Sequence, residues 1–114
     1  MIRDIKMYLG DILENIKTAE DFVEGMSYEE FISDKKTHFA VIRCLEVMGE
    51  AIKQIPGELR EKHPGIPWKD IAGMRDKLIH FYFGIRLEKV WETVKKEIPP
   101  LKPLFEKILK ELKG

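Results

Sequence analysis

The chain has 114 residues, of which 44% are hydrophobic and 35% charged, and its 20 basic side chains balance its 20 acidic ones. This length suits one domain over residues 1–114 with its own core, and the balanced charge excludes a protein that binds nucleic acid by global attraction. A single cysteine, Cys44, excludes an intramolecular disulfide and favours the cytoplasm, and the short apolar runs predict neither a signal peptide nor a membrane span.

Three helical segments are predicted in the first half of the chain. Apolar residues recur every three or four positions over residues 2–23, and Gly25 is placed to end that helix. Residues 27–30 have the form of a capping box, which opens a short helical turn. Asp34 is expected to cap a long helix that runs to about Ile55.

The long helix over residues 34–55 has an unusual pattern, because it carries two apolar stripes. Two stripes indicate burial on two sides, either at the centre of a bundle or against a second subunit. The remaining face is expected to form ion pairs along its own row. That row consists of Arg43, Glu46, Glu50 and Lys53.

The second half of the chain is also helical in pattern. Residues 57–67 contain several glycines and prolines and predict the longest connection, with one helical turn in it. Pro67 suits the first turn of the next helix, which is expected to end near Gly84. Two more helices follow, separated by Pro99-Pro100. Because no segment alternates like a β-strand, the predicted fold class is an all-α, up-down bundle of four or five helices.

The residues that suggest chemistry lie near the end of the helix that follows Pro67. Arg75 carries a permanent, forked cation that fits phosphate oxygens, and His80 can exchange a proton near neutral pH. Tyr82 adds a hydroxyl group and a flat ring. Together these groups supply what metal-free cleavage of a phosphodiester requires.

The spacing of these residues restricts how they could form one site. On a regular helix Arg75 and His80 are rotated by about 140° and do not share a face, whereas Arg75 and Tyr82 lie nearly in line. A common site therefore needs either a loosened helix near His80 or a second subunit that supplies the complementary group. A purely structural interpretation also stands, in which Arg75 pairs with Asp70, Asp76 or a glutamate of the preceding long helix.

The other polar residues give weaker indications of a catalytic or metal site. His38 and His63 have no metal-ligand spacing around them and are expected at the surface or at helix caps, so no metal site is predicted. Glu46 and Glu50 lack the accompanying Glu-x-x-His pairs of a di-metal bundle. With Arg43 they are expected to form structural ion pairs, or else to line a catalytic cleft behind the reacting groups.

The spacing Arg75-x4-His80-x-Tyr82 resembles the signature of the HEPN superfamily, and more narrowly the form found in HepT-like toxins. Further phrases resemble that branch in the same order, so the similarity covers essentially the whole chain. These phrases are residues 43–51, 66–76, 82–91 and 97–101.

The resemblance implies a metal-independent endoribonuclease without a cofactor, acting as the toxin of a type VII toxin–antitoxin pair. Arg75 and His80 would be catalytic, and the products would be a 2′,3′-cyclic phosphate and a 5′-hydroxyl. Tyr82 would support the site and accept AMP from the antitoxin, a minimal nucleotidyltransferase. Asp76 would orient Arg75 or His80, although a carboxylate there also repels phosphate.

The resemblance also implies a symmetric homodimer with an RNA substrate, in which the catalytic segments face one another, and a larger complex with the antitoxin. A second interpretation keeps this HEPN-like fold and partner without catalysis, as a substrate-binding or regulatory subunit of a nucleotidyltransferase. A third is a dimer in which the motif only ties helices together.

Overall fold

Every regular element in the computed structural model, which describes residues 4–80 and 86–114, is helical. The predicted all-α class is therefore confirmed for these residues. The elements are α1 (Ile5–Val23), α2 (Tyr28–Ser33), α3 (Lys35–Lys53), α4 (Gly57–Lys62), α5 (Trp68–His80), α6 (Leu87–Glu92), the π-helix η2 (Thr93–Glu97), the 3-10 helix η3 (Pro99–Leu101) and α7 (Lys102–Lys113).

Local capping signals in the sequence account for several helix ends. The Ser27 hydroxyl accepts a hydrogen bond from the Glu30 amide at 3.1 Å, and the Glu30 carboxylate accepts one from the Ser27 amide at 2.9 Å, so the predicted capping box is confirmed. Asp34 caps α3 as predicted, accepting from the Thr37 amide at 3.1 Å. Gly25 follows α1 with a φ of 75°, a conformation that costs glycine little.

The helix predicted to end near Gly84 is observed as α5, which runs to His80, and Gly84 lies outside the described residues. The helix predicted over residues 87–98 changes type along its length. Its last turn is a π-turn, in which the Ile98 amide donates to the Thr93 carbonyl oxygen at 2.9 Å. Because Pro99 has no amide hydrogen, it cannot continue the α-helical ladder.

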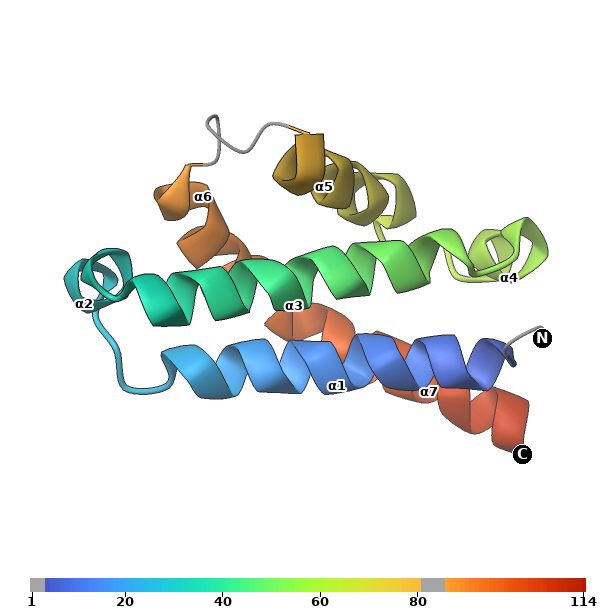
Figure 1. The fold of residues 1–114 in the computed structure, drawn as a ribbon. Helices are drawn as coiled ribbons and strands as arrows, with labels where there is room; N and C mark the ends of the chain where they lie inside the picture. The colour runs from blue at the N-terminus through green and yellow to red at the C-terminus, as the bar shows by residue number, and fades with distance from the viewer. Residues whose placement is uncertain (1–3, 81–85) are drawn as a thin grey trace.

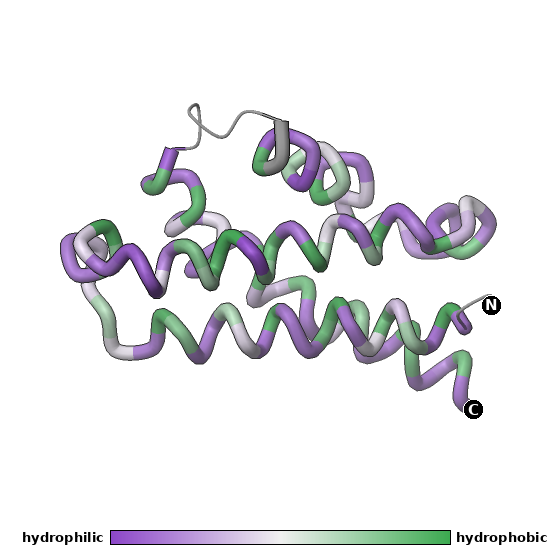
Figure 2. Tube along the Cα trace, viewed as in Figure 1, coloured by the Kyte–Doolittle hydropathy of each residue, from purple (hydrophilic) through white to green (hydrophobic). Residues whose placement is uncertain are grey.

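The helices pack around α3. Figure 1 shows α1 and α3 running antiparallel side by side, with α5 above α3 and α7 behind α1. The two apolar stripes predicted for α3 therefore reflect a central helix that packs against α1 on one side and α5 on the other. Figure 2 shows the matching alternation of hydrophobic and hydrophilic residues along these helices.

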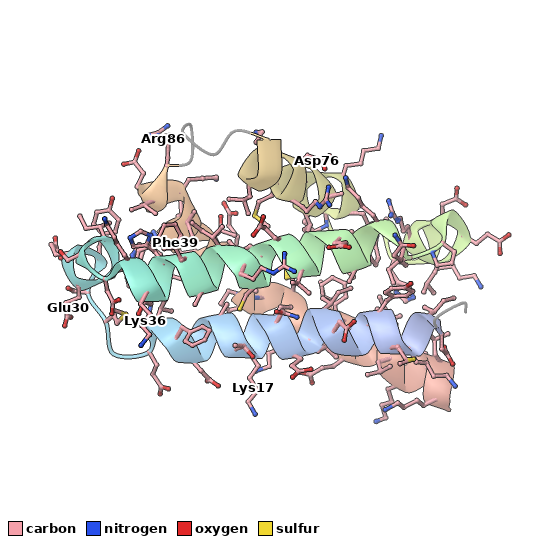
Figure 3. The ribbon with its side chains drawn as sticks, in the orientation of Figure 1. Lys17, Glu30, Lys36, Phe39, Asp76 and Arg86 are labelled. Carbon is pink, nitrogen blue, oxygen red and sulfur yellow. The ribbon has the colours of Figure 1, made fainter. Side chains whose placement is uncertain are left out.

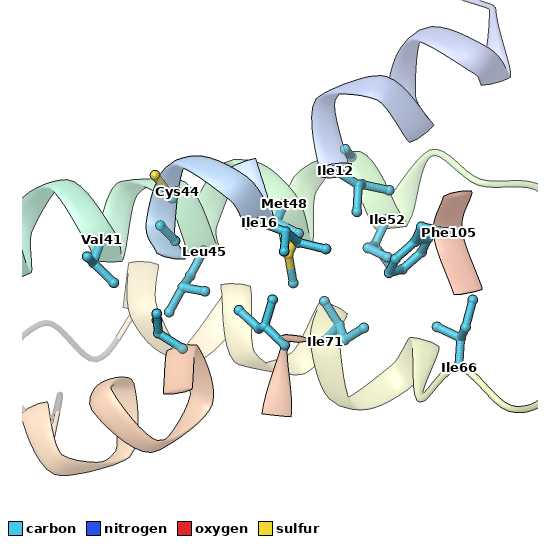
Figure 4. Packing of buried hydrophobic residues seen from close by; sticks show 14 of the residues in the cluster. Ile12, Ile16, Val41, Cys44, Leu45, Met48, Ile52, Ile66, Ile71 and Phe105 are labelled. Carbon is cyan, nitrogen blue, oxygen red and sulfur yellow. The ribbon is translucent and has the colours of Figure 1, made fainter. Parts of the chain in front are cut away.

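One hydrophobic core joins the helices. Figure 4 shows Ile16 of α1, Met48 and Ile52 of α3, and Ile71 of α5 pointing into a shared interior with Phe105 of α7. Each such side chain is at most 5% exposed. Burial of a side chain of this size stabilises the fold by about 1.5–3 kcal/mol, so this core fixes where α5 lies on α3.

The predictions for the two described histidines had opposite outcomes. His63 follows α4 as its C-terminal cap, as predicted. His38 was predicted at the surface or a cap, and this was wrong: it is 8% exposed, with its ring centroid 5.9 Å from that of Phe31 and 5.3 Å from that of Phe39. The short helix α2 packs on the first turns of α3 and covers His38 with Phe31.

Membrane spans and metal sites are both absent from the described residues. None of their helices is both long enough and apolar enough to cross a membrane. No three histidine, cysteine, aspartate or glutamate side chains among them are grouped so as to hold a metal ion.

Candidate active site

Helix α5 carries the candidate catalytic arginine, and its apolar face determines how that arginine is presented. Ile71 and Leu78 bury this face in the core. The Trp68 indole N–H donates to the His63 carbonyl oxygen at 3.0 Å and anchors the start of the helix. Arg75 lies one turn after Ile71 with its side chain 24% exposed, so it stands at the edge of the contact between α5 and α3.

A glycine of α3 makes room for the arginine. A methyl group built on Gly49 would overlap the Cβ of Arg75 and come within 3.2 Å of the Ile71 carbonyl oxygen. Only a residue without a side chain therefore lets the two helices approach this closely. The sequence interpretation did not identify Gly49, although a glycine inside a helix, where it costs about 1 kcal/mol relative to alanine, is itself a signal of close packing.

The Arg75 guanidinium is held by a carboxylate that also binds α3. Its Nη1 donates to Asp76 Oδ1 at 3.2 Å, and the same oxygen accepts from Lys53 Nζ. The hydrogen bond from Lys53, aided by that from Arg75, lowers the pKa of Asp76 below its usual value. Asp76 is therefore a carboxylate at neutral pH, and two cations surround one anion. Figure 3 places Asp76 on α5, above α3.

This arrangement corrects one prediction and decides part of another. Lys53 was predicted to pair within its own row on α3, and this was wrong, because it reaches across to Asp76 instead. Of the structural partners considered for Arg75, Asp76 is the one observed, and Asp70 is not. Within residues 4–80 and 86–114, the Nε of Arg75 is buried without a hydrogen-bond partner.

The three residues proposed to stand behind the reacting groups lie on α3. Arg43 and Glu50 are exposed and Glu46 is partly buried. In the part of the chain that the structure describes, no hydrogen bond or ion pair joins any of them to Arg75. Their predicted place along a cleft stays a prediction.

The described part of the motif ends at the backbone of His80. Helix α5 includes the backbone of both Arg75 and His80. Positions 75 and 80 are therefore rotated by about 140° about the axis of α5. The alternative in which the helix loosens near His80 extends toward Gly84, which lies outside the described residues. The side chain of His80 and the whole of Tyr82 lie outside the described residues.

A separate groove lies on the other flank of α5. Its volume is about 950 Å³, and α5, α6, η2 and η3 contribute to its walls. The floor is apolar and includes Ile71, Leu78 and Val90, and Lys69 and Lys77 stand among its polar residues. Leu45 and Met48 of α3 also line this groove, and Arg75 does not.

The fold and the motif together define a class of protein: a small all-α bundle with a partly exposed arginine five residues before a histidine position on one helix. A family model described as "Ribonuclease HepT-like" matches residues 12–108. The chain belongs to this HepT-like ribonuclease family.

The names of two relatives agree with this family. The chain is 57% identical over 112 residues to a protein of Methanocaldococcus jannaschii named as a candidate RNase, covering 98% of this chain and 93% of that one. It is 53% identical over 110 residues to a Thermococcus cleftensis protein named "Probable ribonuclease HepT", covering 96% of this chain and 100% of that one. No solved structure matches the chain.

Proposed function

We propose that this protein is a metal-independent endoribonuclease that cleaves RNA as the toxin of a toxin–antitoxin pair, built as one HEPN-like domain over residues 1–114. Its family and the names of its relatives support the ribonuclease activity. The observation on the molecule itself that carries the proposal is the state of Arg75. It is partly exposed and, among the described residues, its guanidinium bonds to its neighbour in the helix and to no other helix, which leaves part of its fork to bind a phosphate.

In the proposed reaction, the His80 imidazole removes the proton from a ribose 2′-OH. The 2′-oxygen then attacks the adjacent phosphorus, the bond to the 5′-oxygen of the next nucleotide breaks, and that oxygen takes up a proton. Arg75 stabilises the negative charge that builds on the phosphorane oxygens. A positioned acid or base typically contributes about 10²–10⁴-fold in rate, and one preorganised charge-stabilising donor about 10²–10³-fold.

The proposed site is shared between two protomers. Positions 75 and 80 lie about 140° apart around the axis of a helix that includes both residues. A two-fold axis beside α5 would place the arginine of one protomer opposite the histidine of its partner. This geometry supports a homodimer as the active form.

Regulation is proposed at Tyr82. An antitoxin nucleotidyltransferase would move AMP from ATP to the phenol oxygen, releasing pyrophosphate and the phenol proton. The added phosphate would bring negative charge to the place where the RNA phosphate binds, and would block it as phosphorylation blocks other anion sites.

The lone free thiol, Cys44, is buried, which agrees with the proposed cytoplasmic location.

Incubation of the purified protein with tRNA and mRNA in the presence of EDTA tests the proposal. We expect cleavage by the wild type, products that end in a 2′,3′-cyclic phosphate, and no cleavage by His80→Ala. If neither protein cuts any RNA, the ribonuclease proposal is wrong and the non-catalytic subunit of a nucleotidyltransferase is favoured. If cleavage occurs only without EDTA, metal independence is wrong.

A further inference from the structure

Lys53 of α3 forms its ion pair with a residue of another helix. It is the last residue of α3, and its ammonium group reaches across to α5, where it binds Asp76 Oδ1. The same oxygen accepts the hydrogen bond from Arg75 Nη1 at 3.2 Å. One carboxylate oxygen therefore joins the end of α3 to the arginine of α5, although Lys53 and Asp76 are 23 residues apart.

The net charge of Lys53, Asp76 and Arg75 together affects how well Arg75 can bind an RNA phosphate. Asp76 alone would cancel the charge of Arg75 and repel an approaching phosphate. With Lys53 present, the three side chains carry a net charge of about +1, and Oδ1 of Asp76 accepts from both cations. The carboxylate can then orient the arginine without neutralising the site.

The geometry gives Lys53 influence over where the guanidinium lies. The guanidinium of Arg75 has one hydrogen bond among the described residues, the one to Asp76, and its buried Nε has none. Asp76 is 46% exposed, so its carboxylate would be free to turn toward solvent if Lys53 did not hold it. The orientation of Arg75 therefore depends on α3 through two linked contacts.

We propose that Lys53 is a positioning residue that holds Asp76 against Arg75 and offsets its charge, so that the guanidinium is set to bind the RNA phosphate. This inference rests on the proposed ribonuclease function. Lys53 does not touch the substrate in this account. It differs from a merely structural tie between α3 and α5, which would act on stability alone.

The test combines Lys53→Met, which keeps the aliphatic stem, with Lys53→Arg, Asp76→Asn and the double variant Lys53→Met/Asp76→Asn. Lys17→Met serves as the control, because Lys17 extends from α1 on the side of the molecule away from α5 (Figure 3). For Lys53→Met we expect RNA cleavage to fall on the order of 10–100-fold, the range typical of groups that orient a catalytic residue. Lys53→Arg and Lys17→Met should retain activity.

The double variant separates positioning from direct contact with RNA. If Lys53 acts through Asp76, Asp76→Asn should lose about as much activity as Lys53→Met, and the double variant should lose no more than either single variant. A double variant whose loss is the product of the two single losses would overturn the inference, because Lys53 would then act on RNA independently of Asp76. Wild-type cleavage by Lys53→Met would overturn it as well.

A second readout does not depend on cleavage. The Arg75 Nε–H resonance and the pH titration of the Asp76 carboxyl carbon can be followed by NMR in the wild type, Lys53→Met and Lys17→Met. We expect both signals to change in Lys53→Met and neither in Lys17→Met. Unchanged signals in Lys53→Met reject the positioning role even in a protein that cuts RNA. If the wild type cuts no RNA, the proposed function fails, and these signals still decide whether Lys53 controls Arg75.

Discussion

Gly49 of α3 lies directly against the side chain of Arg75, with no room between them for even a methyl group. The contact fixes the stem of the arginine on the neighbouring helix, while its guanidinium extends to Asp76 at the edge. A methyl group added at Gly49 would therefore affect both the stability of the fold and the position of Arg75.

The variant Gly49→Ala should therefore be destabilising and less active. Overpacking of this kind typically costs about 1–3 kcal/mol, which for a domain of this size lowers Tm by roughly 4 °C per kcal/mol. Gly10→Ala is the matched control, because it also lies inside a helix and nothing approaches its added methyl group within 4 Å. That control should gain up to about 1 kcal/mol. Equal Tm shifts in thermal unfolding would show that the close contact at Gly49 has no energetic effect.

Replacement of Arg75 by lysine should separate catalysis from folding. The lysine keeps an aliphatic stem against Gly49 and a positive charge, but it loses the planar fork that matches two phosphate oxygens. We expect cleavage to fall by about 10²–10³-fold with Tm nearly unchanged. Single-turnover cleavage and thermal unfolding measure the two effects. A large loss of Tm with undiminished cleavage would favour the interpretation in which Arg75 only ties helices together.

The ion pair at Asp76 predicts a specific dependence of stability on pH. Because Lys53 and Arg75 lower the pKa of Asp76 below 3.8, the folded protein binds fewer protons at this carboxyl than the unfolded chain does as the medium becomes acidic. Its contribution is fully present above that value and is lost as pH falls through the lower pKa of the folded state.

The difference in unfolding free energy between wild type and Asp76→Asn should accordingly be constant from about pH 7 to pH 5 and shrink below about pH 4. Urea unfolding at a series of pH values measures it. Glu106→Gln, an exposed change on α7, is the control and should show no such trend. A difference that persists undiminished in strong acid would contradict the ion pair.

The thiol of Cys44 should react slowly in the native protein. The residue is 6% exposed, and burial raises the pKa of its thiol, so little of the nucleophilic thiolate is present or accessible at about pH 8. Ellman's reagent should therefore label it quickly only in concentrated guanidinium. Rapid labelling of the native protein would mean that the helix packing around α3 opens readily.

The features that the sequence predicted well are local ones. The caps at Ser27 and Asp34 depend on side chains that bond to amides three residues away, so their patterns are readable without the fold. The burial of α3 on two sides also followed from its two apolar stripes, and the structure shows that both sides pack within the chain, against α1 and α5. The same reasoning failed for Lys53, because a row of alternating charges on a helix says nothing about a partner on another helix.

The sequence predicted the motif residues of the candidate site but not their contacts with other helices. Arg75 stood out through its spacing to His80, and the regular course of α5 agrees with the prediction that the two positions do not share a face. The contacts of Arg75 with Gly49, and of Asp76 with Lys53, join residues far apart in the sequence. Such pairings depend on how α3 and α5 cross, which no local pattern specifies.

Mixing two inactive variants tests the central claim most directly, namely that Arg75 of one protomer acts with His80 of the other. Arg75→Ala and His80→Ala, each inactive alone, should be co-expressed with different tags so that the mixed dimer can be purified. A mixed dimer contains one site with both wild-type groups, so we expect it to cleave RNA at about half the wild-type rate. A mixed dimer that is pure, folded and inactive would contradict a site shared between protomers.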